Sequence, residues 1–379
     1  MKYVVFGVGR QGLAVIYDLI ERCDASHVVA YDVDGRARER IAAVLAREAE
    51  LVAFHAVSPA DAASAAQIES QIADAACAIS ALPYALNPAV TRLCLGARVP
   101  LCDLGGNPDI VAEQARLCGE SGLVLPDCGL APGLNNLWAV HLRQAHGCTR
   151  IRALCGGIPA RRMDDNPLQY KLLFSPWGLI SEYSGRCAVL VGGKVESREA
   201  LTGLEALPGE RECFYTSNNS PLVFENLARI GVRDYEYKTV RWAGHLERVL
   251  LLKRLGFFCG NRALDGALAE ALGTAEFLRF ERGRDVDEVF LRVEGTADGG
   301  RAHSLELRVQ ADSRFTAMEL TTSWGVTIPA YFVALSRAGR LPAGVAVVTL
   351  PRGCLPPERV IDSAWGLGEV ERRTKVDVT

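Results

Sequence analysis

The sequence predicts an α/β protein with a doubly wound parallel sheet at its start and a second, α+β domain with a mixed or antiparallel sheet. Up to Asp127, short apolar segments alternate with segments whose apolar residues recur at helical spacing. Strands and helices that alternate in this way form a parallel sheet covered on both faces. After Asp127 the apolar residues alternate with polar ones, which is typical of half-buried strands.

The first part of the chain is expected to contain one helix after each strand except the last. The expected strands are Tyr3–Phe6, His27–Tyr31, Leu51–Phe54, Cys77–Leu82, Val99–Leu104 and Leu123–Pro126. The expected helices are Gln11–Cys23, Arg36–Ala49, Pro59–Ala73, Pro88–Leu95 and Pro108–Cys118. Because a helix connects successive strands, the strands are expected to run parallel.

The second part begins with an expected helix, Leu134–Ala145, and continues with strands. The clearest alternating segments are Arg150–Cys155, Cys187–Val191, Glu288–Glu294 and Ser304–Ala311. The segment Ala297-Asp298-Gly299-Gly300 predicts a hairpin between the last two. The tail is expected to be helical over Ile328–Ala338 and then irregular, since glycine and proline are frequent there.

The composition is that of an ordinary globular protein. Of the 379 residues, 49% are hydrophobic and 23% are charged, and the formal net charge of −3 does not favour a nucleic-acid partner. We expect a soluble, cytoplasmic protein without a membrane contact, because no signal peptide precedes the first strand and no apolar segment is long enough to cross a bilayer. The 12 cysteines include no CxxC pair, so we expect free thiols and no metal site.

A glycine motif lies between the first strand and the first helix. Gly7, Gly9 and Gly12 form a GxGxxG pattern, with Arg10 and Gln11 at the start of the helix. The first glycine permits a tight turn, the second lets a pyrophosphate approach the backbone, and the third lets the helix pack against the strand. The N-terminus of the helix would then hold the phosphates. The motif predicts a Rossmann dinucleotide-binding domain.

Asp32 ends the second expected strand, where a carboxylate can accept hydrogen bonds from both ribose hydroxyls. Such a carboxylate repels a 2′-phosphate, so the cofactor is expected to be NAD. Asp34 is an alternative to Asp32, and Arg36 leaves some use of NADP open. Asp32 could also be a helix-capping or turn residue.

The ends of the later strands are expected to surround the nicotinamide ring, because ligands bind beyond the carboxyl ends of parallel strands. These ends carry Ala81, Leu82 and Pro83, then Gly105, Gly106 and Asn107, and finally Asp127. The two adjacent glycines could equally form a simple turn.

Several longer motifs resemble one family. They are Pro126–Asn136, Asp103–Asn107, Gly156–Pro159, Asn166–Lys171, Phe174–Tyr183 and Tyr237–His245. Together they resemble the saccharopine dehydrogenase-like family over nearly the whole chain. One departure is Thr216–Ser220, which carries bulkier asparagines where the family's loop is richer in glycine.

The resemblance implies a division into a Rossmann NAD-binding domain (1–130), a substrate-binding and dimerisation domain (131–324) and a C-terminal segment (325–379) that returns to the first domain. It implies NAD-dependent oxidative deamination of the lysine ε-amine, with release of ammonia, and a homodimer. A saccharopine or carboxynorspermidine-type C–N oxidoreductase is a close alternative. A non-catalytic NAD-binding sensor is an alternative of another class.

Three residues are candidates for acid–base chemistry. His245 titrates near neutral pH without special tuning, and Lys171 could act as a base if it is partly buried. Asp127, at a strand end, could hold the substrate ammonium or orient water. Each also has a structural interpretation: a satisfied histidine, a solvated lysine and a turn-capping aspartate.

Four residues are candidates for substrate binding. Arg241 could grip a carboxylate with two hydrogen bonds, and Asn135 lies at the start of an expected helix, which also suits an anion. Tyr170 and Lys238 lie in the same motifs as Lys171 and Arg241. Arg241 could instead be an ion-pair arginine, and Asn135 a helix cap.

Overall fold

The computed structural model describes residues 1–105, 107–163, 165–217, 221–345 and 350–374. The chain divides into two compact units. The first consists of Met1–Leu137 together with Glu319–Asp377, and the second of Trp138–Met318 with the last two residues. In the part of the chain that the structure describes, no helix combines the length and the apolar character needed to cross a membrane.

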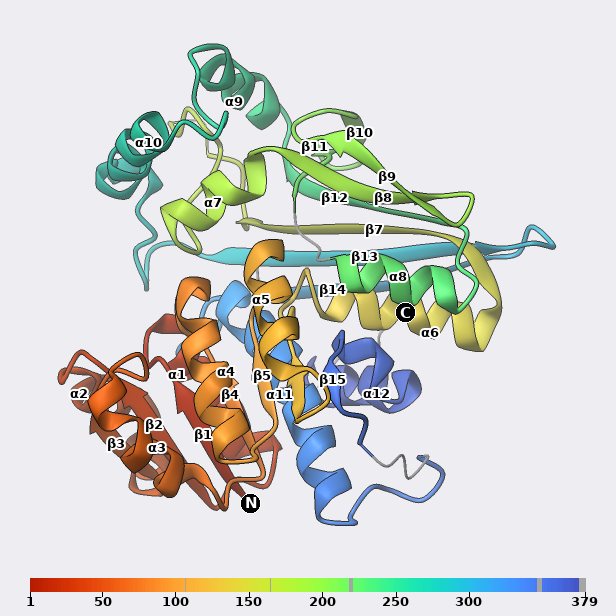
Figure 1. The fold of residues 1–379 in the computed structure, drawn as a ribbon. Helices are drawn as coiled ribbons and strands as arrows, with labels where there is room; N and C mark the ends of the chain where they lie inside the picture. Colours follow the sequence, from red (N-terminus) through yellow and green to blue (C-terminus); the bar gives the residue numbers. More distant parts are fainter. Residues whose placement is uncertain (106, 164, 218–220, 346–349, 375–379) are drawn as a thin grey trace. The chain divides into compact units, whose positions relative to one another are not determined.

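The first unit is built on a parallel sheet with helices on both faces (Figure 1). Its strands are β1 (Lys2–Phe6), β2 (His27–Asp32), β3 (Val52–Ala56), β4 (Cys77–Ser80), β5 (Leu101–Asp103), β6 (Leu123–Leu125) and β15 (Gly353–Cys354). The spatial order is β15-β6-β5-β4-β1-β2-β3, and every neighbouring pair is parallel. The predicted doubly wound Rossmann sheet is therefore confirmed, with its change of direction between β1 and β4.

The strands of this sheet are apolar over most of their length because helices cover both faces. Val4, Val5 and Phe6 of β1 are completely buried. The helices of this unit are α1 (Arg10–Arg22), α2 (Ala37–Leu45), α3 (Ala65–Ile72), α4 (Asn87–Gly96), α5 (Pro108–Cys118), α11 (Ala317–Arg337) and α12 (Ser363–Thr374), with short 3₁₀ turns at Ala46–Leu51, Ala62–Ser64, Tyr84–Leu86 and Pro357–Arg359. α1 packs beside α2, and α3, α4 and α5 pack in a row.

The C-terminal helix α12, which was expected to be irregular, is fixed to the first unit by a buried ion pair. Arg373, whose side chain is 1% exposed, donates to Asp18 of α1 through Nε at 3.1 Å and Nη2 at 3.0 Å, and pairs with Glu369 at 2.6 Å. Gly366 lies against Leu137 of α6 (Leu134–His146). These tertiary contacts stabilise a helix whose glycines disfavour it locally.

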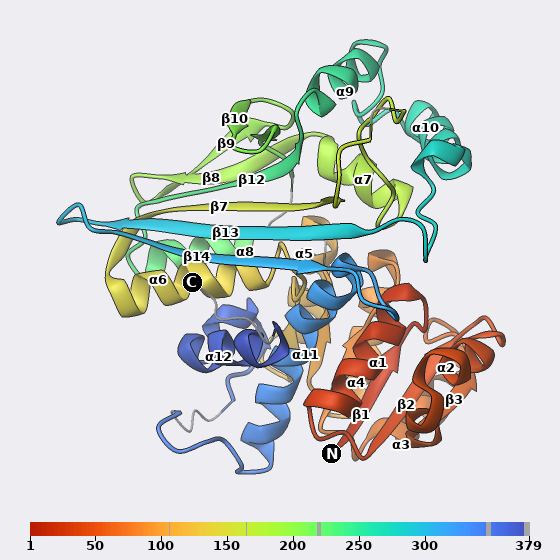
Figure 2. The ribbon, with the colours of Figure 1, turned by 180° about the vertical axis from the view of Figure 1, so that it is seen from behind.

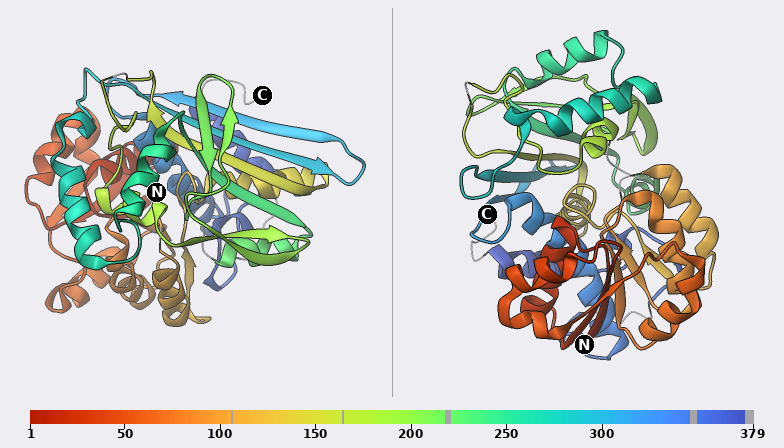
Figure 3. Two further views of the ribbon diagram at one scale, coloured as in Figure 1. Left: turned by 90° about the horizontal axis from the view of Figure 1, so that it is seen from above. Right: turned by 90° about the vertical axis from the view of Figure 1, so that its left-hand side faces the viewer.

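The second unit contains a mixed sheet, as predicted (Figure 2). Its strands are β7 (Cys148–Pro159), β8 (Arg186–Val191), β9 (Lys194–Glu199), β10 (Glu205–Leu207), β11 (Arg211–Phe214), β12 (Asp234–Trp242), β13 (Asp287–Ala297) and β14 (Ala302–Gln310). The main order is β10-β11-β12-β7-β13-β14, and β8 pairs with both β12 and β9. Only β12 and β7 pair in parallel among these described strands. The long β13–β14 hairpin, predicted from Ala297–Gly300, is clear in Figure 3.

Three of the remaining helices of this unit share one apolar core cluster. The remaining helices of the unit are α7 (Pro176–Tyr183), α8 (Pro221–Arg229), α9 (His245–Arg254) and α10 (Arg262–Thr274), with a 3₁₀ turn at Glu276–Leu278. Tyr170, Tyr183, Phe214 and Leu246 belong to one buried cluster that α7, α9 and α10 share. This cluster surrounds the polar side chains described below.

Candidate active site

The glycine turn between β1 and α1 has the geometry that a dinucleotide requires. Gly7 has a φ of +93°, and a Cβ there would lie 2.9 Å from the Ala81 carbonyl group. A Cβ at Gly12 would lie 1.9 Å from the Gly7 oxygen, whereas a Cβ at Gly9 would meet nothing within 4 Å. Gly7 and Gly12 therefore permit close packing, and Gly9 faces open space. The N-cap residue of α1, Gly9, makes no side-chain cap, so the N–H groups of the first turn can receive a pyrophosphate.

The end of β2 carries two aspartates with different partners. Asp32 accepts from Val8 N at 2.7 Å and from Asp34 N at 2.9 Å, which ties it to the glycine turn. Asp34 instead pairs with Arg40 at 2.7 Å and Arg36 at 3.1 Å, and these hydrogen bonds lower the pKa of its carboxyl group. Asp32 is therefore the better placed of the two to meet a ribose, because Asp34 is occupied by arginines.

Two buried aspartates lie at the neighbouring ends of β5 and β6. Asp103 is completely buried and accepts from Gly105 N at 2.8 Å and Gln114 Nε2 at 2.7 Å. Burial raises the pKa of Asp103 to about 7, and the charge of Asp127 adds to the rise, against the hydrogen bond from Gln114. Asp127 has a φ of +59°, and a Cβ on Gly105 would lie 2.1 Å from Asp127 Oδ1. Only a glycine at position 105 leaves room for the Asp127 side chain.

The other residues that the sequence predicts to bind the cofactor differ from one another in their contacts. Ala81 and Leu82 lie against Gly7, and Pro83 follows them in an exposed position. Arg10 pairs with Glu319 at 2.6 Å. The Gln11 side-chain oxygen is buried without a partner among the described residues. The Asn107 side chain caps α5 by accepting from Asp109 N and Ile110 N, so the structure gives it a local role, and Gly106 lies outside the described residues.

In the second unit, Arg241 of β12 forms the centre of a buried polar cluster. A guanidinium carries five N–H donors. Nε donates to the Tyr183 hydroxyl at 2.9 Å, and Nη1 donates to Thr239 Oγ1 at 2.9 Å and to the Val240 carbonyl at 3.0 Å. Nη2 donates to both carboxylate oxygens of Glu182 at 3.1 Å. Every donor is used, so the prediction that Arg241 grips a substrate carboxylate is not supported, and the ion-pair alternative describes this structure.

His245 completes the same cluster as a buried, neutral side chain. Its Nδ1 lies 2.7 Å from the Leu168 carbonyl, which can only accept, so Nδ1 carries the proton. Its Nε2 therefore accepts from the Tyr183 hydroxyl at 2.8 Å. Burial lowers the pKa of His245 to about 3, and the charge of Arg241 adds to this effect. The prediction that His245 is the general base is thus at odds with the structure, because a base needs a free nitrogen that titrates near neutral pH.

Two predicted lysines lie apart from Arg241. Lys238 and Arg241 lie three residues apart on β12, so their side chains point to opposite faces of the sheet. Lys238 binds the Gly203 carbonyl and Glu205. Lys171 donates to the Arg279 carbonyl at 3.0 Å and pairs with Asp285 at 3.2 Å. Both contact patterns are those of structural ion pairs, so neither lysine joins the predicted catalytic group.

Asn135, in the first unit, has local partners. It is completely buried, accepts from Gly133 N at 3.1 Å and donates to Asn136 Oδ1 at 2.9 Å. These contacts support the turn before α6 and match the helix-capping alternative rather than the prediction that Asn135 binds an anion.

Tyr170 and Glu182 remain as candidates near Arg241. The Tyr170 ring lies 5.0 Å from the guanidinium carbon of Arg241, and its buried hydroxyl has no hydrogen-bond partner among the described residues. Sequence reasoning missed Glu182, although it lies in the quoted motif Phe174–Tyr183. The signal available was a single charged residue in an otherwise uncharged helix.

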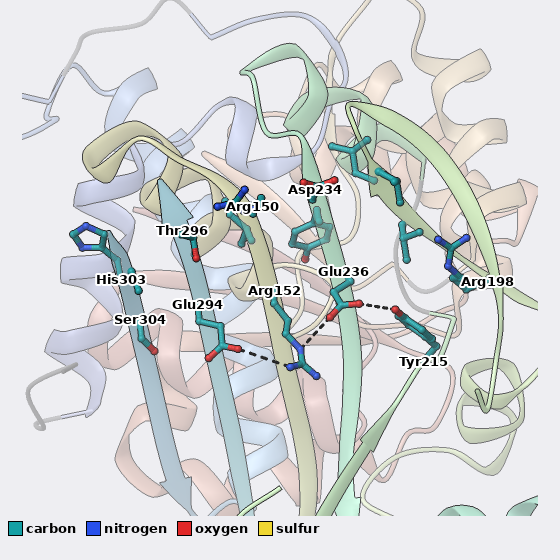
Figure 4. Close-up of a pocket in the computed structure, with 17 residues that line it drawn as sticks. Arg150, Arg152, Arg198, Tyr215, Asp234, Glu236, Glu294, Thr296, His303 and Ser304 are labelled. Carbon is teal, nitrogen blue, oxygen red and sulfur yellow. Dashed lines mark hydrogen bonds and ion pairs between the residues drawn. The ribbon is translucent and has the colours of Figure 1, made fainter. Parts of the chain in front are cut away.

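A cavity of about 570 Å³ lies elsewhere in the second unit, on the face of the sheet formed by β7, β12, β13 and β14 (Figure 4). Arg152 lies between Glu236 and Glu294, at 3.1 and 4.0 Å, and the Tyr215 hydroxyl donates to Glu236. None of the predicted site residues lines this cavity, whose lining carries three arginines and three acidic side chains. Among the described residues, no group of three or more His, Cys, Asp or Glu side chains is arranged to hold a metal ion.

Comparison with known proteins identifies the family. A sequence profile of the saccharopine dehydrogenase C-terminal domain matches residues 129–363. The chain belongs to the saccharopine dehydrogenase family. It is 26% identical over 203 residues to the mitochondrial alpha-aminoadipic semialdehyde synthase of Bos taurus and 27% identical over 202 residues to the saccharopine dehydrogenase [NADP(+), L-glutamate-forming] of Saccharomyces cerevisiae.

These alignments cover about half of this chain, 50% in both cases, but only 22% of the bovine protein and 45% of the yeast protein. A solved structure of the L-Glu-forming saccharopine dehydrogenase from Saccharomyces cerevisiae shares the fold, with a TM-score of 0.69 and 17% identity over 100% of this chain and 98% of that one. Both parts of the chain therefore have the architecture of this family.

The pKa of His245 predicts how stability depends on pH. Between pH ~6.5 and pH 3 the unfolded state binds a proton that the folded state does not, so stability should fall as the pH drops, by about 1 kcal/mol per unit from this group. His245→Gln should lose this part of the dependence. Urea unfolding at pH 7.5 and pH 5 measures this change in the free energy of unfolding. The variant His27→Gln, at an exposed position, is the control. If His245→Gln and the wild type lose the same stability, the buried neutral histidine is disproved.

Proposed function

We propose that the protein is a nicotinamide-dependent dehydrogenase that oxidises a carbon–nitrogen bond of an amino acid. The observation that carries this proposal is the glycine turn of the first unit, with Gly9 open, α1 uncapped and two buried aspartates at the ends of β5 and β6. A turn of this kind supports dinucleotide binding, and the membership in the saccharopine dehydrogenase family supports an amine as the substrate.

We propose NAD as the cofactor. The backbone of the glycine turn would hold its pyrophosphate, and Asp32 would accept hydrogen bonds from its ribose. When bound, the cofactor supplies the acceptor for a hydride. The yeast relative is named as an NADP(+) enzyme, and Arg36, whose side chain is 81% exposed beside Asp34, is the feature of this chain that favours NADP.

The finer proposal is the reaction of an L-lysine 6-dehydrogenase. Lysine loses a hydride from Cε, and water replaces the nitrogen: R–CH₂–NH₃⁺ + NAD⁺ + H₂O gives R–CHO + NH₄⁺ + NADH + H⁺. The aldehyde, 2-aminoadipate 6-semialdehyde, cyclises to piperideine-6-carboxylate. The substrate ammonium must first lose a proton, and a water must later be activated. Asp127, held by the positive-φ turn beside Gly105, is the residue that we assign to one of these steps.

The alternative substrate is saccharopine, which the names of the relatives favour. Saccharopine is a secondary amine that joins the lysine nitrogen to a glutarate carbon, so its oxidation releases glutamate rather than ammonia. The homodimer that the resemblance implies stays a prediction.

The decisive experiment is turnover of the purified protein with NAD and L-lysine. We expect reduced cofactor, absorbing at ~340 nm, together with one ammonia for each reduced cofactor. Parallel reactions with saccharopine and with NADP identify the alternatives. Glutamate release from saccharopine without a reaction on lysine would replace the finer proposal, and cofactor binding without turnover of any amine would leave only the non-catalytic sensor.

Asp127→Asn tests the proposed acid–base residue. The side chain keeps its size but loses its ability to accept a proton, so kcat should fall by about 100-fold or more, while the affinity for the reduced cofactor stays within about twofold. Steady-state kinetics and fluorescence titration measure the two quantities. Asp109→Asn, at an exposed position on α5, is the control. An unchanged kcat in Asp127→Asn would remove Asp127 from the chemistry.

Asp32→Ala tests the cofactor assignment. It removes a charged hydrogen-bond acceptor at the ribose, so the Kd for NADH should rise by roughly 10- to 100-fold. Asp34→Asn should have a much smaller effect, because Asp34 is already paired with Arg36 and Arg40. Fluorescence titration with NADH and NADPH gives the affinities. A loss of lysine binding with normal NADH binding in Asp32→Ala would contradict the assignment.

A further inference from the structure

We propose that the edge strand β14 pairs antiparallel with β14 of a second copy of this chain, in the register that places Glu306 opposite the partner's Arg308. The sheets of the two copies would then join into one sheet across a two-fold axis. The homodimer that the family resemblance implies thereby gains a surface and a register. The pairing is independent of the reaction proposed above, because it uses no residue assigned to the cofactor or the substrate.

β14 is the last strand on one side of the second unit's sheet. In the order β10-β11-β12-β7-β13-β14 it pairs with β13 alone among the described strands, and Figure 2 shows it beside β13 at the border of the sheet. Ser304, Arg308 and Gln310 of this strand are exposed. An edge strand presents a row of unpaired backbone N–H and C=O groups, with which another strand can pair.

The register of the β13–β14 hairpin decides which backbone groups of β14 point away from the sheet. At one end of the hairpin the Ala297 N–H donates to the Arg301 carbonyl at 3.0 Å, and at the other end the Ala311 N–H donates to the Asp287 carbonyl at 3.2 Å. In an antiparallel ladder, hydrogen-bonded pairs alternate with pairs that are not hydrogen-bonded. The odd-numbered residues of β14 therefore bond to β13, and the N–H and C=O groups of the even-numbered residues point outward.

The charges on β14 select one register for the pairing. Even-numbered residues must lie opposite even-numbered residues, because only their backbone groups point outward. A register centred on Glu306 sets this residue opposite its own copy, and a register centred on Arg308 does the same for the arginine, so both place like charges face to face. The register centred on Leu307, between them, sets Glu306 opposite the partner's Arg308, and the two-fold axis repeats this contact.

The two charged side chains keep hydrogen-bonding positions for a second copy. The Arg308 side chain is 49% exposed, and its Nε donates to Glu306 Oε1 at 2.7 Å. Its Nη1 lies 3.8 Å from Glu288, whereas Nη2 has no ion-pair partner among the described residues. Within the described residues, Glu306 Oε1 accepts from Arg308 alone, and a carboxylate oxygen can accept two hydrogen bonds. Each copy therefore offers a donor and an acceptor to the other.

The other face of the same junction is apolar. Successive residues of a strand point to alternate faces, so Leu305, Leu307 and Val309 lie on the face opposite the charges. In the register centred on Leu307, Leu305 comes opposite the partner's Val309. Leu305 and Val309 are both partly exposed in the single chain. The pairing would remove some of their apolar surface from water, which favours association.

The test compares two charge reversals alone and mixed, by analytical ultracentrifugation. Glu306→Arg leaves arginine at both positions and Arg308→Glu leaves glutamate at both, so each variant alone sets like charges opposite one another. We expect a dimeric wild type, and a dimer dissociation constant that rises about 10-fold or more in each variant. An equimolar mixture of E306R and R308E should dimerise nearly as tightly as the wild type, because opposite charges then face each other in the mixed dimer.

Two further variants complete the test. Arg301→Glu makes the same charge change at an exposed position just before β14, and it should leave the dimer unchanged. Ser304→Pro removes an outward N–H without touching the ladder to β13, a position where an edge strand tolerates proline, so it should fold and dimerise more weakly. A dimer that survives both charge reversals and Ser304→Pro, or a wild type that stays monomeric at its highest soluble concentration, would overturn the pairing. A monomer that oxidises an amine would overturn it and leave the proposed function standing.

Discussion

The close approach of α1 to the ends of β1 and β4 is the constraint on which the cofactor end of the molecule depends. A Cβ at Gly12 would overlap the Gly7 oxygen, and a Cβ at Gly7 would be too close to the Ala81 backbone. This contact brings the uncapped helix N-terminus to the point where the strand order reverses. A phosphate placed there would meet backbone N–H groups and the positive end of the helix dipole, so the glycines leave room for the dinucleotide that we propose.

Buried charge organises the second unit in a comparable way. Arg241 is out of reach of solvent, so it must be paired within the protein, and Glu182, Tyr183 and Thr239 provide that pairing. The network extends through Tyr183 to a neutral His245. Such an arrangement is rigid because the loss of any member leaves a buried polar group unsatisfied. The exposed edge of the network, at Glu182, is therefore a well-fixed carboxylate.

The ends of β5 and β6 carry two aspartates that lie against one turn, at Gly105. Asp103 binds the turn at Gly105, and that turn lies against Asp127. The positive φ of Asp127 is a backbone conformation that is uncommon for residues other than glycine, although aspartate tolerates it better than most. Burial raises the pKa of Asp103, and the charge of Asp127 adds to this rise.

The sequence by itself determined the Rossmann fold and the family, because strand–helix alternation, GxGxxG and the longer motifs are local patterns. It also indicated the β13–β14 hairpin through Gly299 and Gly300. It failed for α12, whose glycines argue against a helix until Arg373 meets Asp18 across the chain. Only the tertiary structure shows the partners of Arg241, His245 and Lys238. Whether a side chain is free, saturated or on the opposite face depends on partners distant in sequence, and those partners decide whether it can touch a substrate.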